Sequence, residues 1–416
     1  MAIPEEPTQD DVTAELNEWL SANWDPDRSL LAWREIIVDA GWAKPSWSTE
    51  CHGRALPAWS ESLVPRLFRE FGAVGVPSGG GVFLVAPTLM NHASDDLNRR
   101  MLRRTLTGEL TWTQLFSEPG NGSDLAGLTT SATRDGDTWI INGQKVWSTS
   151  AHHADMAIIV ARSDFDAPKH KGISYFVMDM NQPGIEVRGI KQMNNHASFN
   201  EIFIADAEIP EADRVGDVGE GWRIAKTTLS YERGLSGNRP RLRPQMSGRT
   251  WDEANAEAAE NLKVYSWYPQ RAGRADLLIE RAQKLGCNND PVIRQEIAKL
   301  ESLRMASEWT AARARAARAL GRKPGPEGSL GKLAASQIAK TSARIHAMIG
   351  GSQAMLAGTD RHADEIVAEV LISTPAVSIA GGTDEIQHNI LGDNILGLPR
   401  EPGFGRDTPF RDIPRN

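Results

Sequence analysis

The stretch "LTTSATRDGDTWIINGQKVWSTS", residues 128–150, marks a change in the character of the chain. Its β-branched and alternating residues are typical of half-buried strands. Asp135-Gly136 and Asn142-Gly143 are pairs that tight turns favour, so they predict turns at both places. Further strand patterns follow in "DMAIIVARS", "GISYFVMDM", "GIEVRGIKQM" and "FNEIFIADAEIP". Short strands at this spacing predict a small barrel or sandwich over residues 119–213.

Helical patterns flank this region on both sides. Residues 8–116 carry apolar residues at helical spacing, as in "DVTAELNEWLSANW" and "RSLLAWREIIVDAGW". From "GEGWRIAKTTLSYERG" onward, long periodic stretches alternate with short Gly/Pro loops, which predicts an antiparallel helix bundle. The predicted fold class is α+β. The predicted domains are an N-terminal helical domain (1–116), a central β domain (117–215) and a C-terminal helical bundle (216–416).

Composition limits the classes of function. The chain has 416 residues, 40% of them hydrophobic, and a net charge of -8, which is typical of a soluble protein with more than one core. It has no dense Lys/Arg block, so nucleic acid is not an expected partner. No apolar run approaches the roughly 20 residues of a membrane span. Cys51 and Cys287 form no CxxC, and the N-terminus lacks a signal-peptide core, so we expect a cytoplasmic protein.

The richest polar loop is "FSEPGNGSDLAG", residues 116–127, referred to below as the polar loop. Its glycines allow tight turns and leave backbone N–H groups that can grip a phosphate or a carbonyl. It is neither a Walker A loop nor a GxGxxG between a strand and a helix. Taken alone, a structural turn is the simpler interpretation. With "NGQKVWSTS", which puts Trp147 and Thr149 on one strand face, it can form a wall for a flat aromatic ligand.

A second loop, "SIAGGTDEIQHNILG", residues 378–392, leads into a predicted helix near the end of the chain. Gly381 and Gly382 allow a bend, Thr383 is a good N-cap, and acidic residues follow in the first turn. The two glycines raise the question of whether a reacting side chain is missing here.

The polar loop, "GDTWIINGQKVWSTSAHHADMAIIVARSD" and "AGGTDEIQHNILGDNILGLPR", in this order, resemble the acyl-CoA dehydrogenase family. The likeness covers essentially the whole chain, and the motifs TEPG-x-GSD, NG-x-K-x-W-I-T and GT-x-EIQ rarely occur together elsewhere. The resemblance implies an N-terminal helical domain, a central β-barrel domain and a C-terminal four-helix bundle. It also implies an oxidoreductase that binds FAD, removes hydrogen across Cα–Cβ of an acyl-CoA thioester and reduces an electron-transfer flavoprotein.

The resemblance assigns cofactor contacts to all three motifs. These residues are Gln114, Phe116, Ser117, Gly122, Ser123, Trp147, Thr149, Thr383 and Glu385. In the family, the residue matching Ser117 bonds the flavin ring edge, the one matching Trp147 covers the ring, and the one matching Thr149 bonds near N5. Gly122 and Ser123 fall where the loop meets flavin or the CoA arm, so Ser123 is also a substrate-binding candidate.

The family's commonest base, a Glu just before Gly-Thr, is absent. Gly381 occupies that position and cannot take a proton, although its N–H can still bond the thioester carbonyl. In "GWRIAKTTLSYERG", Glu232 continues an apolar stripe with spacings of three and four residues. A carboxylate on a buried stripe is costly unless it is paired or functional. Burial would raise its pKa from ~4.3 toward neutrality, which suits a base.

Isovaleryl- and long-chain acyl-CoA dehydrogenases resemble this arrangement, with the base in an "ER" pair that Glu232-Arg233 matches. The resemblance places Arg233 close to the CoA arm. The alternatives are that Glu232 only pairs with Arg239 or Lys226, and that Arg233 forms a surface salt bridge.

The chain departs from the family where the FAD diphosphate of a neighbouring subunit is bound. "ERAQKLGCNNDPVIRQ" lacks the Arg of R-x-x-FG at its usual spacing, with Arg281 the nearest substitute, and Ala347 stands at the Gln of Q-x-FGG. Some bacterial relatives that act on sterol-derived thioesters are heterotetramers of two gene products. A homotetramer and a heterotetramer with a paralogous chain therefore both stay open. Two alternative functions also remain, a non-catalytic or half-site subunit and an acyl-CoA oxidase.

The position of the proposed base also bears on the substrate. A base on the helix favours a branched, bulky or sterol- or ring-derived acyl-CoA. Tryptophans of the N-terminal segment either shape a wide pocket or belong to the core: Trp33, Trp42, Trp47 and Trp59.

His152-His153 is expected to be a strand-end turn and not a metal site, because adjacent strand residues point apart.

Overall fold

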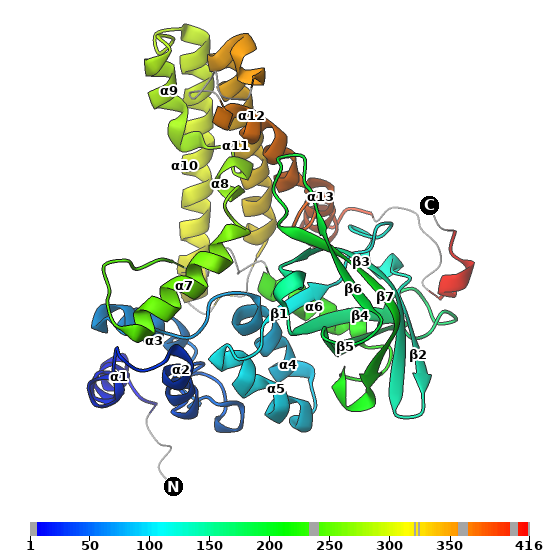
Figure 1. Ribbon diagram of the computed structural model, residues 1–416. Helices are drawn as coiled ribbons and strands as arrows, with labels where there is room; N and C mark the ends of the chain where they lie inside the picture. The colour runs from blue at the N-terminus through cyan, green and yellow to red at the C-terminus, as the bar shows by residue number, and fades with distance from the viewer. Residues whose placement is uncertain are drawn as a thin grey trace. The chain divides into compact units, whose positions relative to one another are not determined.

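Helices come first, a sheet follows, and helices return after it, which confirms the predicted α+β order (Figure 1). The computed structural model describes residues 6–232, 241–319, 322, 325–356, 365–399 and 407–414. The chain divides into two compact units. The first comprises Met1–Ile190, Ser198–Val264 and Phe404–Asn416, and the second comprises Lys191–Ala197 and Tyr265–Gly403. The domain boundaries at residues 116 and 215 stay predictions.

Amphipathic helices open the first unit. They are α1 (Gln9–Asn23), α2 (Leu30–Asp39), α3 (Ser60–Phe71), α4 (Ala86–His92) and α5 (Asp95–Thr107). Thr8, Ser29 and Ser94 accept backbone N–H bonds as the N-caps of α1, α2 and α5. The tryptophans named above join the core of this unit, which favours the core interpretation. Trp33, Trp42 and Trp47 are buried, and Trp59 packs against them partly buried.

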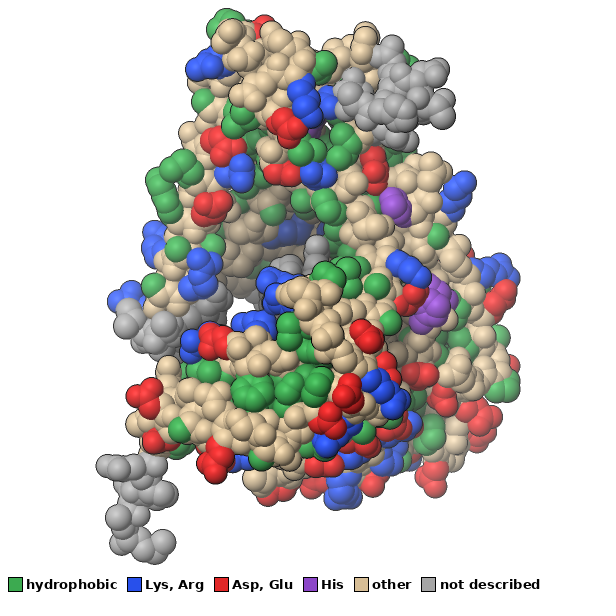
Figure 2. Space-filling model, turned by 60° about the vertical axis from the view of Figure 1, so that its left-hand side comes forward, with side chains coloured by type: hydrophobic (Ala, Val, Ile, Leu, Met, Phe, Trp, Pro, Cys, Tyr) green, Lys and Arg blue, Asp and Glu red, His purple; other side chains and the backbone are tan. Residues whose placement is uncertain are grey.

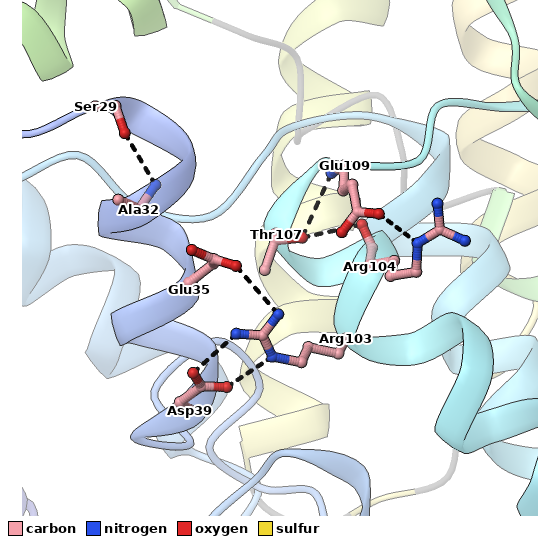
Figure 3. Close-up of polar contacts among 8 residues, drawn as sticks. All are labelled: Ser29, Ala32, Glu35, Asp39, Arg103, Arg104, Thr107 and Glu109. Atoms are coloured by element: carbon pink, nitrogen blue, oxygen red, sulfur yellow. Dashed lines mark hydrogen bonds and ion pairs between the residues drawn. The ribbon is translucent and has the colours of Figure 1, made fainter.

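Ion pairs tie α5 to α2 at the surface of this helical region (Figure 3). The Arg103 guanidinium donates to both carboxylate oxygens of Asp39 at 2.9 Å and to Glu35 at 3.3 Å. These bonds lower the pKa of the Asp39 carboxyl, against the opposing effect of burial. A third of the Arg103 side chain is exposed, so solvent weakens the pairs.

Among the described residues, an eight-stranded sheet follows. Its strands are β1 (Trp112–Leu115), β2 (Ser131–Asp135), β3 (Thr138–Thr149), β4 (Met156–Arg162), β5 (Ile173–Asp179), β6 (Ile185–Ile190), β7 (Phe199–Pro210) and β8 (Arg214–Val215). Their order is β6-β7-β3-β2-β4-β5-β8, and β1 pairs in parallel with β4. The strands β4 and β5 are almost wholly buried because apolar clusters cover both faces. Ile158 and Val160 join the cluster of the N-terminal helices, whereas Ile159 and Ala161 join a second cluster.

The two predicted turns have different outcomes. Asp135-Gly136 does connect β2 to β3, with Gly136 at φ 59°. The turn predicted at Asn142-Gly143 is wrong, because β3 runs through it as a β-bulge opposite β7. Asn142 bonds Asp206 through two contacts, of 2.9 and 3.0 Å, across the bulge. A Cβ on Gly143 would lie 2.5 Å from the Thr130 hydroxyl, so close packing, not a reversal of the chain, requires this glycine.

Two helices complete the first unit, α6 (Gly221–Glu232) and α7 (Arg249–Lys263). The helix α6 is anchored at Thr228, which is fully buried. The hydroxyl of Thr228 hydrogen-bonds the Tyr175 hydroxyl of β5 at 3.1 Å and the Thr88 hydroxyl at 3.2 Å. These buried bonds fix the rotation of α6 about its axis, which decides where Glu232, one turn later, is directed.

The second unit is helical. Its helices are α8 (Tyr268–Arg271), α9 (Leu278–Lys284), α10 (Pro291–Ala319), α11 (Glu327–Gly350), α12 (Glu365–Ser373) and α13 (Asp384–Leu391). Leu278, Leu300, Ile345 and Ile349 form its buried core. Large apolar side chains also remain exposed on α10 and after α13: Val292, Met305, Trp309, Ile395, Leu396 and Leu398.

Charges are mixed along the surface. On the face drawn in Figure 2, Lys and Arg side chains lie among Asp and Glu side chains. Many form pairs one helical turn apart, such as Arg249–Glu253 and Lys284–Glu280. Arg313 and Arg315 on α10 are exposed. Within the described residues, no helix combines the length and the apolar character that crossing a membrane requires.

Candidate active site

The polar loop leaves β1 and is anchored at its start by a buried ion pair. The Lys145 ammonium, on β3, donates to the Phe116 carbonyl and to the Glu118 carboxylate, each at 3.0 Å. The Lys145 side chain is fully buried and that of Glu118 is 4% exposed. The Val146 N–H also donates to the Ser117 carbonyl at 2.9 Å. The first residues of the loop are therefore fixed against the strand that carries Trp147.

Glu118 in turn organises the far side of the loop. Its carboxylate accepts from the Thr129 N–H at 2.7 Å, the Thr129 hydroxyl at 2.9 Å and the Thr130 N–H at 2.8 Å. Burial alone would raise the pKa of Glu118, but the Lys145 ammonium and the bonds from Thr130 and Thr129 lower this pKa to about 2. Glu118 is thus ionised at neutral pH and is a structural anion rather than a proton acceptor.

The tip of the loop is open. Gly120, Gly122 and Ser123 are exposed, and a Cβ built on either glycine meets nothing within 4 Å. Phe116, in contrast, is buried and packs edge-on against Tyr175, with ring centroids 5.9 Å apart. Its side chain is therefore part of the core.

Trp147 has an unusual backbone and an unusual exposure. Its φ is +64°, a left-handed value that is rare for a bulky residue, and the β3–β7 register shifts between Lys145 and Ser148. Its side chain is 58% exposed and contacts Phe199 edge-on. Ser148 is buried and Thr149 is half-buried. Strain that holds a large aromatic ring outward clusters at ligand sites, so this feature points to a ring-binding surface.

Glu232 lies at the end of α6, as the stripe predicts. Ala225 is buried, and Trp222 and Leu229 pack against the core. Glu232 continues this face and is half-buried. The Gln114 side-chain amide, on β1 two residues before Phe116, donates to the Glu232 carboxylate at 3.5 Å. The carboxylate thus lies beside the strand that leads into the polar loop.

The structure describes some of the basic residues that the sequence singled out, and not others. Lys226 is exposed on α6, and Arg239 and the substrate-binding candidate Arg233 lie outside the described residues. Arg281, the candidate for the diphosphate contact, is buried in α9.

The histidine pair forms the predicted strand-end turn, in a 3-10 helix over Ala151–His153. The expectation that the two rings point apart is wrong, because their centroids lie 4.0 Å apart in this tight turn.

The glycine pair in the second unit makes the predicted entry to a helix. Gly381 and Gly382 have φ values of +70° and +86°, so both adopt the left-handed conformation. The Thr383 hydroxyl accepts from the Ile386 N–H at 3.2 Å and caps α13. Gly381 and Glu385 are exposed. Asp384 is buried and accepts from the Lys340 ammonium at 2.9 Å.

Sequence reasoning missed Lys145 and Glu118, although both stand inside the motifs it used. The signal was available, because Lys145 falls inside a strand that otherwise buries apolar residues. A lysine at such a position requires a buried anion, and Glu118 is the acid in the adjoining loop.

Comparisons with known proteins identify the family. A family model described as the acyl-CoA dehydrogenase middle domain matches residues 113–207, and one for the C-terminal domain of that family matches residues 272–396. The acyl-CoA dehydrogenase IpdE1 of Mycobacterium tuberculosis is 32% identical over 379 residues, which cover 89% of this chain and 88% of that protein.

Solved structures share the fold. The ChsE4-ChsE5 complex from Mycobacterium tuberculosis matches with a TM-score of 0.63 at 23% identity, over 96% of this chain and 100% of that chain. The Tcur3481-Tcur3483 steroid ACAD matches with a TM-score of 0.63 at 20% identity, over 96% and 100% of the two chains. The chain belongs to the acyl-CoA dehydrogenase family, whose members are flavoprotein oxidoreductases of lipid β-oxidation.

Proposed function

We propose that the chain is an FAD-dependent acyl-CoA dehydrogenase in which Glu232 takes the α proton of the thioester substrate. The observation that carries the proposal is the position of Glu232, half-buried beside Gln114 at the start of the polar loop. The second is Gly381, which leaves the family's commonest base position without a carboxylate. A base must lie within hydrogen-bond reach of the proton that it removes, and the Gln114 contact supports a position for Glu232 near β1, which leads into the polar loop.

The residues of the first unit fit a flavin. Trp147 offers an exposed aromatic face, and Ser117 and Thr149 are half-buried polar groups on the adjoining loop and strand. The open backbone at Gly122 and the exposed Ser123 fit an approach by the cofactor or by the CoA arm. Bound FAD would supply the hydride acceptor for the β hydrogen. Gln114 would hold the Glu232 carboxylate in place, and the Lys145–Glu118 pair would hold the loop.

The second unit contributes backbone geometry in this proposal. The Gly381 N–H would bond the thioester carbonyl, and such a bond strengthens as negative charge develops on the oxygen. Thr383 and Glu385 would lie near FAD, as the resemblance assigns. Thr383 keeps its position because its hydroxyl caps α13. Arg233 stays a candidate for the CoA arm on the resemblance alone.

The substrate that we propose is a branched or ring-bearing acyl-CoA, with a sterol-derived thioester as the first choice. Two observations support this. The base lies on α6, as in members that accept branched or long acyl groups, and one structure of the same fold is a steroid ACAD.

We also propose that the chain works as an oligomer, with a paralogous chain as the favoured partner. Val292, Met305 and Trp309 expose apolar surface on α10. The lack of the family's diphosphate Arg leaves part of the FAD contact to another chain, and the ChsE4-ChsE5 structure is a complex of two chains. An electron-transfer flavoprotein is the proposed acceptor. A half-site role and an oxidase activity are the competing functions.

Anaerobic reduction of the flavin tests the proposal. The chain is purified alone and together with a paralogous chain, and its visible spectrum is recorded before and after addition of straight-chain, isovaleryl and steroid-derived CoA thioesters. The proposal expects bleaching of the flavin band, fastest with a bulky thioester, without peroxide formation in air. A flavin-containing protein that none of these thioesters bleaches would contradict it, and peroxide formation during turnover would favour the oxidase.

A further inference from the structure

A short C-terminal segment, residues 407–414, packs onto the first unit, beside the chain that connects β4 to β5. We refer to it as the C-terminal clip. The Phe410 N–H donates to the Ala167 carbonyl and the Arg411 N–H to the Phe165 carbonyl, each at 3.0 Å. Pro409 forms a β-bridge with Pro168. Phe410 is 4% exposed, so its ring is buried in the first unit.

Arg162 lies directly beneath that ring. Its guanidinium carbon is 3.4 Å from the centroid of Phe410, and the side chain is fully buried at the end of β4. The same guanidinium donates to the carbonyls of Ala126 at 2.7 Å and Leu128 at 3.1 Å. A buried cation that is satisfied by carbonyls and an aromatic face is held firmly in one position.

These contacts connect the clip to the far end of the polar loop. Ala126 is in the loop and Leu128 directly follows it. The loop is tightly packed here, since a Cβ on Gly127 would lie 2.5 Å from Asn121 and 2.7 Å from Asp124. Asp124 also accepts from the Lys169 ammonium at 2.5 Å, and the Lys169 carbonyl accepts from Arg162 at 3.2 Å. The last residues of the loop thus depend on Arg162, as the first depend on Lys145.

We propose that Arg162 and Phe410 are positioning residues that hold the polar loop in its FAD- and CoA-binding form. The family models that match the chain end at residue 396, so the clip lies outside them. Removal of the Phe410 ring exposes the Arg162 guanidinium to water, and the two loop carbonyls then lose a fixed donor. The link from the loop to FAD rests on the proposed function, whereas the link from the clip to the loop does not.

The test measures the loop directly. Amide hydrogen exchange of residues 118–130 is followed in the full chain, without added FAD and with it, for the wild type and Phe410→Ala. We expect exchange in this segment to rise about tenfold, since the segment draws its protection from local contacts. FAD affinity, titrated by the quenching of flavin fluorescence, should weaken by about tenfold.

Two further variants separate positioning from general stability. Phe68→Ala removes an equally buried ring from α3, so it should lower the thermal midpoint and leave exchange at 118–130 unchanged. Phe410→Leu keeps an apolar cover without the aromatic face. It is expected to fold and to give intermediate exchange, which keeps the test available if Phe410→Ala does not fold.

Unchanged loop exchange in Phe410→Leu and Phe410→Ala would overturn the positioning role. Faster exchange with unchanged FAD affinity would overturn the link to the cofactor. A wild-type chain, alone or with its partner chain, that binds no FAD would contradict the proposed function. In that case the exchange measurement would still decide whether the clip holds the loop.

Discussion

The polar loop and the glycine pair at 381–382 are built in opposite ways. The polar loop is exposed only at its tip, and both of its ends are tied to fully buried cations, Lys145 and Arg162. The glycine pair is held by left-handed backbone angles and by the Thr383 cap. The comparison shows that buried side-chain contacts hold the polar loop in place, whereas backbone angles and a helix cap hold the glycine pair. Gly381 has no side chain that could accept a proton, so the proposed base, Glu232, comes from α6 of the first unit.

Of the substitutions that compare the two regions, Lys145→Met should cause the largest loss of stability. The Glu118 carboxylate would stay buried without its ammonium partner, so the variant should lose about 3–5 kcal/mol of the free energy of unfolding. Urea denaturation measures this loss.

The matched control is the double variant Lys145→Met/Glu118→Gln, which removes both charges and should recover a large part of the stability. Wild-type stability in Lys145→Met would show that the buried pair does not anchor the polar loop.

Acid should weaken the same anchor. The pKa of Glu118 is about 2 in the folded chain, below the ordinary value of 4.5, so the unfolded chain binds more protons between these values. The stabilisation is fully present above the unfolded value and is lost as the pH falls through the folded one, with a limit of about 3 kcal/mol.

Thermal midpoints of the wild type and Glu118→Gln across this range provide the measurement. The gap between the two proteins should narrow as the pH falls below about 4.5, the ordinary value for Glu. A gap that is independent of pH would mean that ionisation of Glu118 contributes nothing.

The glycine pair should respond to small changes of the backbone. Alanine at a left-handed position costs roughly 1–2 kcal/mol. A Cβ at 382 would also lie 2.6 Å from the Gln387 amide, whereas a Cβ at 381 meets nothing within 4 Å. Gly382→Ala should therefore lower the thermal midpoint more than Gly381→Ala does. The reverse order would show that close packing against Gln387 does not add to the cost at 382.

The smallest effect is expected at the surface pairs of Figure 3. Arg103→Ala removes the bonds to Asp39 and Glu35, which are more than a third exposed. The loss should be below about 1 kcal/mol and should shrink in high salt. A double-mutant cycle with Asp39→Ala measures it, and a coupling as large as that of Lys145 and Glu118 would remove the contrast between surface and buried pairs.

The order of helices and sheet could be predicted because apolar periodicity reports which face of an element is buried. The stripe ending at Glu232 and the Thr383 cap could be predicted for the same reason, since each depends on neighbours within one or two turns. The Asn142-Gly143 bulge could not, because it depends on Asp206, which is distant in the sequence on β7, and on Thr130, which packs against Gly143 just before β2. The strain at Trp147 and the Phe410–Arg162 contact likewise depend on partners that periodicity does not identify.

The central claim is that Glu232 takes the α proton, and flavin reduction in Glu232→Gln tests it most directly. The variant is mixed anaerobically with the thioester that bleaches the wild type fastest, beside Glu220→Gln, a control that alters an exposed carboxylate just before α6. We expect the variant to keep its flavin spectrum and its affinity for the thioester, and bleaching to slow by about 10²–10⁴-fold. Glu220→Gln should bleach like the wild type. Bleaching of Glu232→Gln at the wild-type rate would contradict the account.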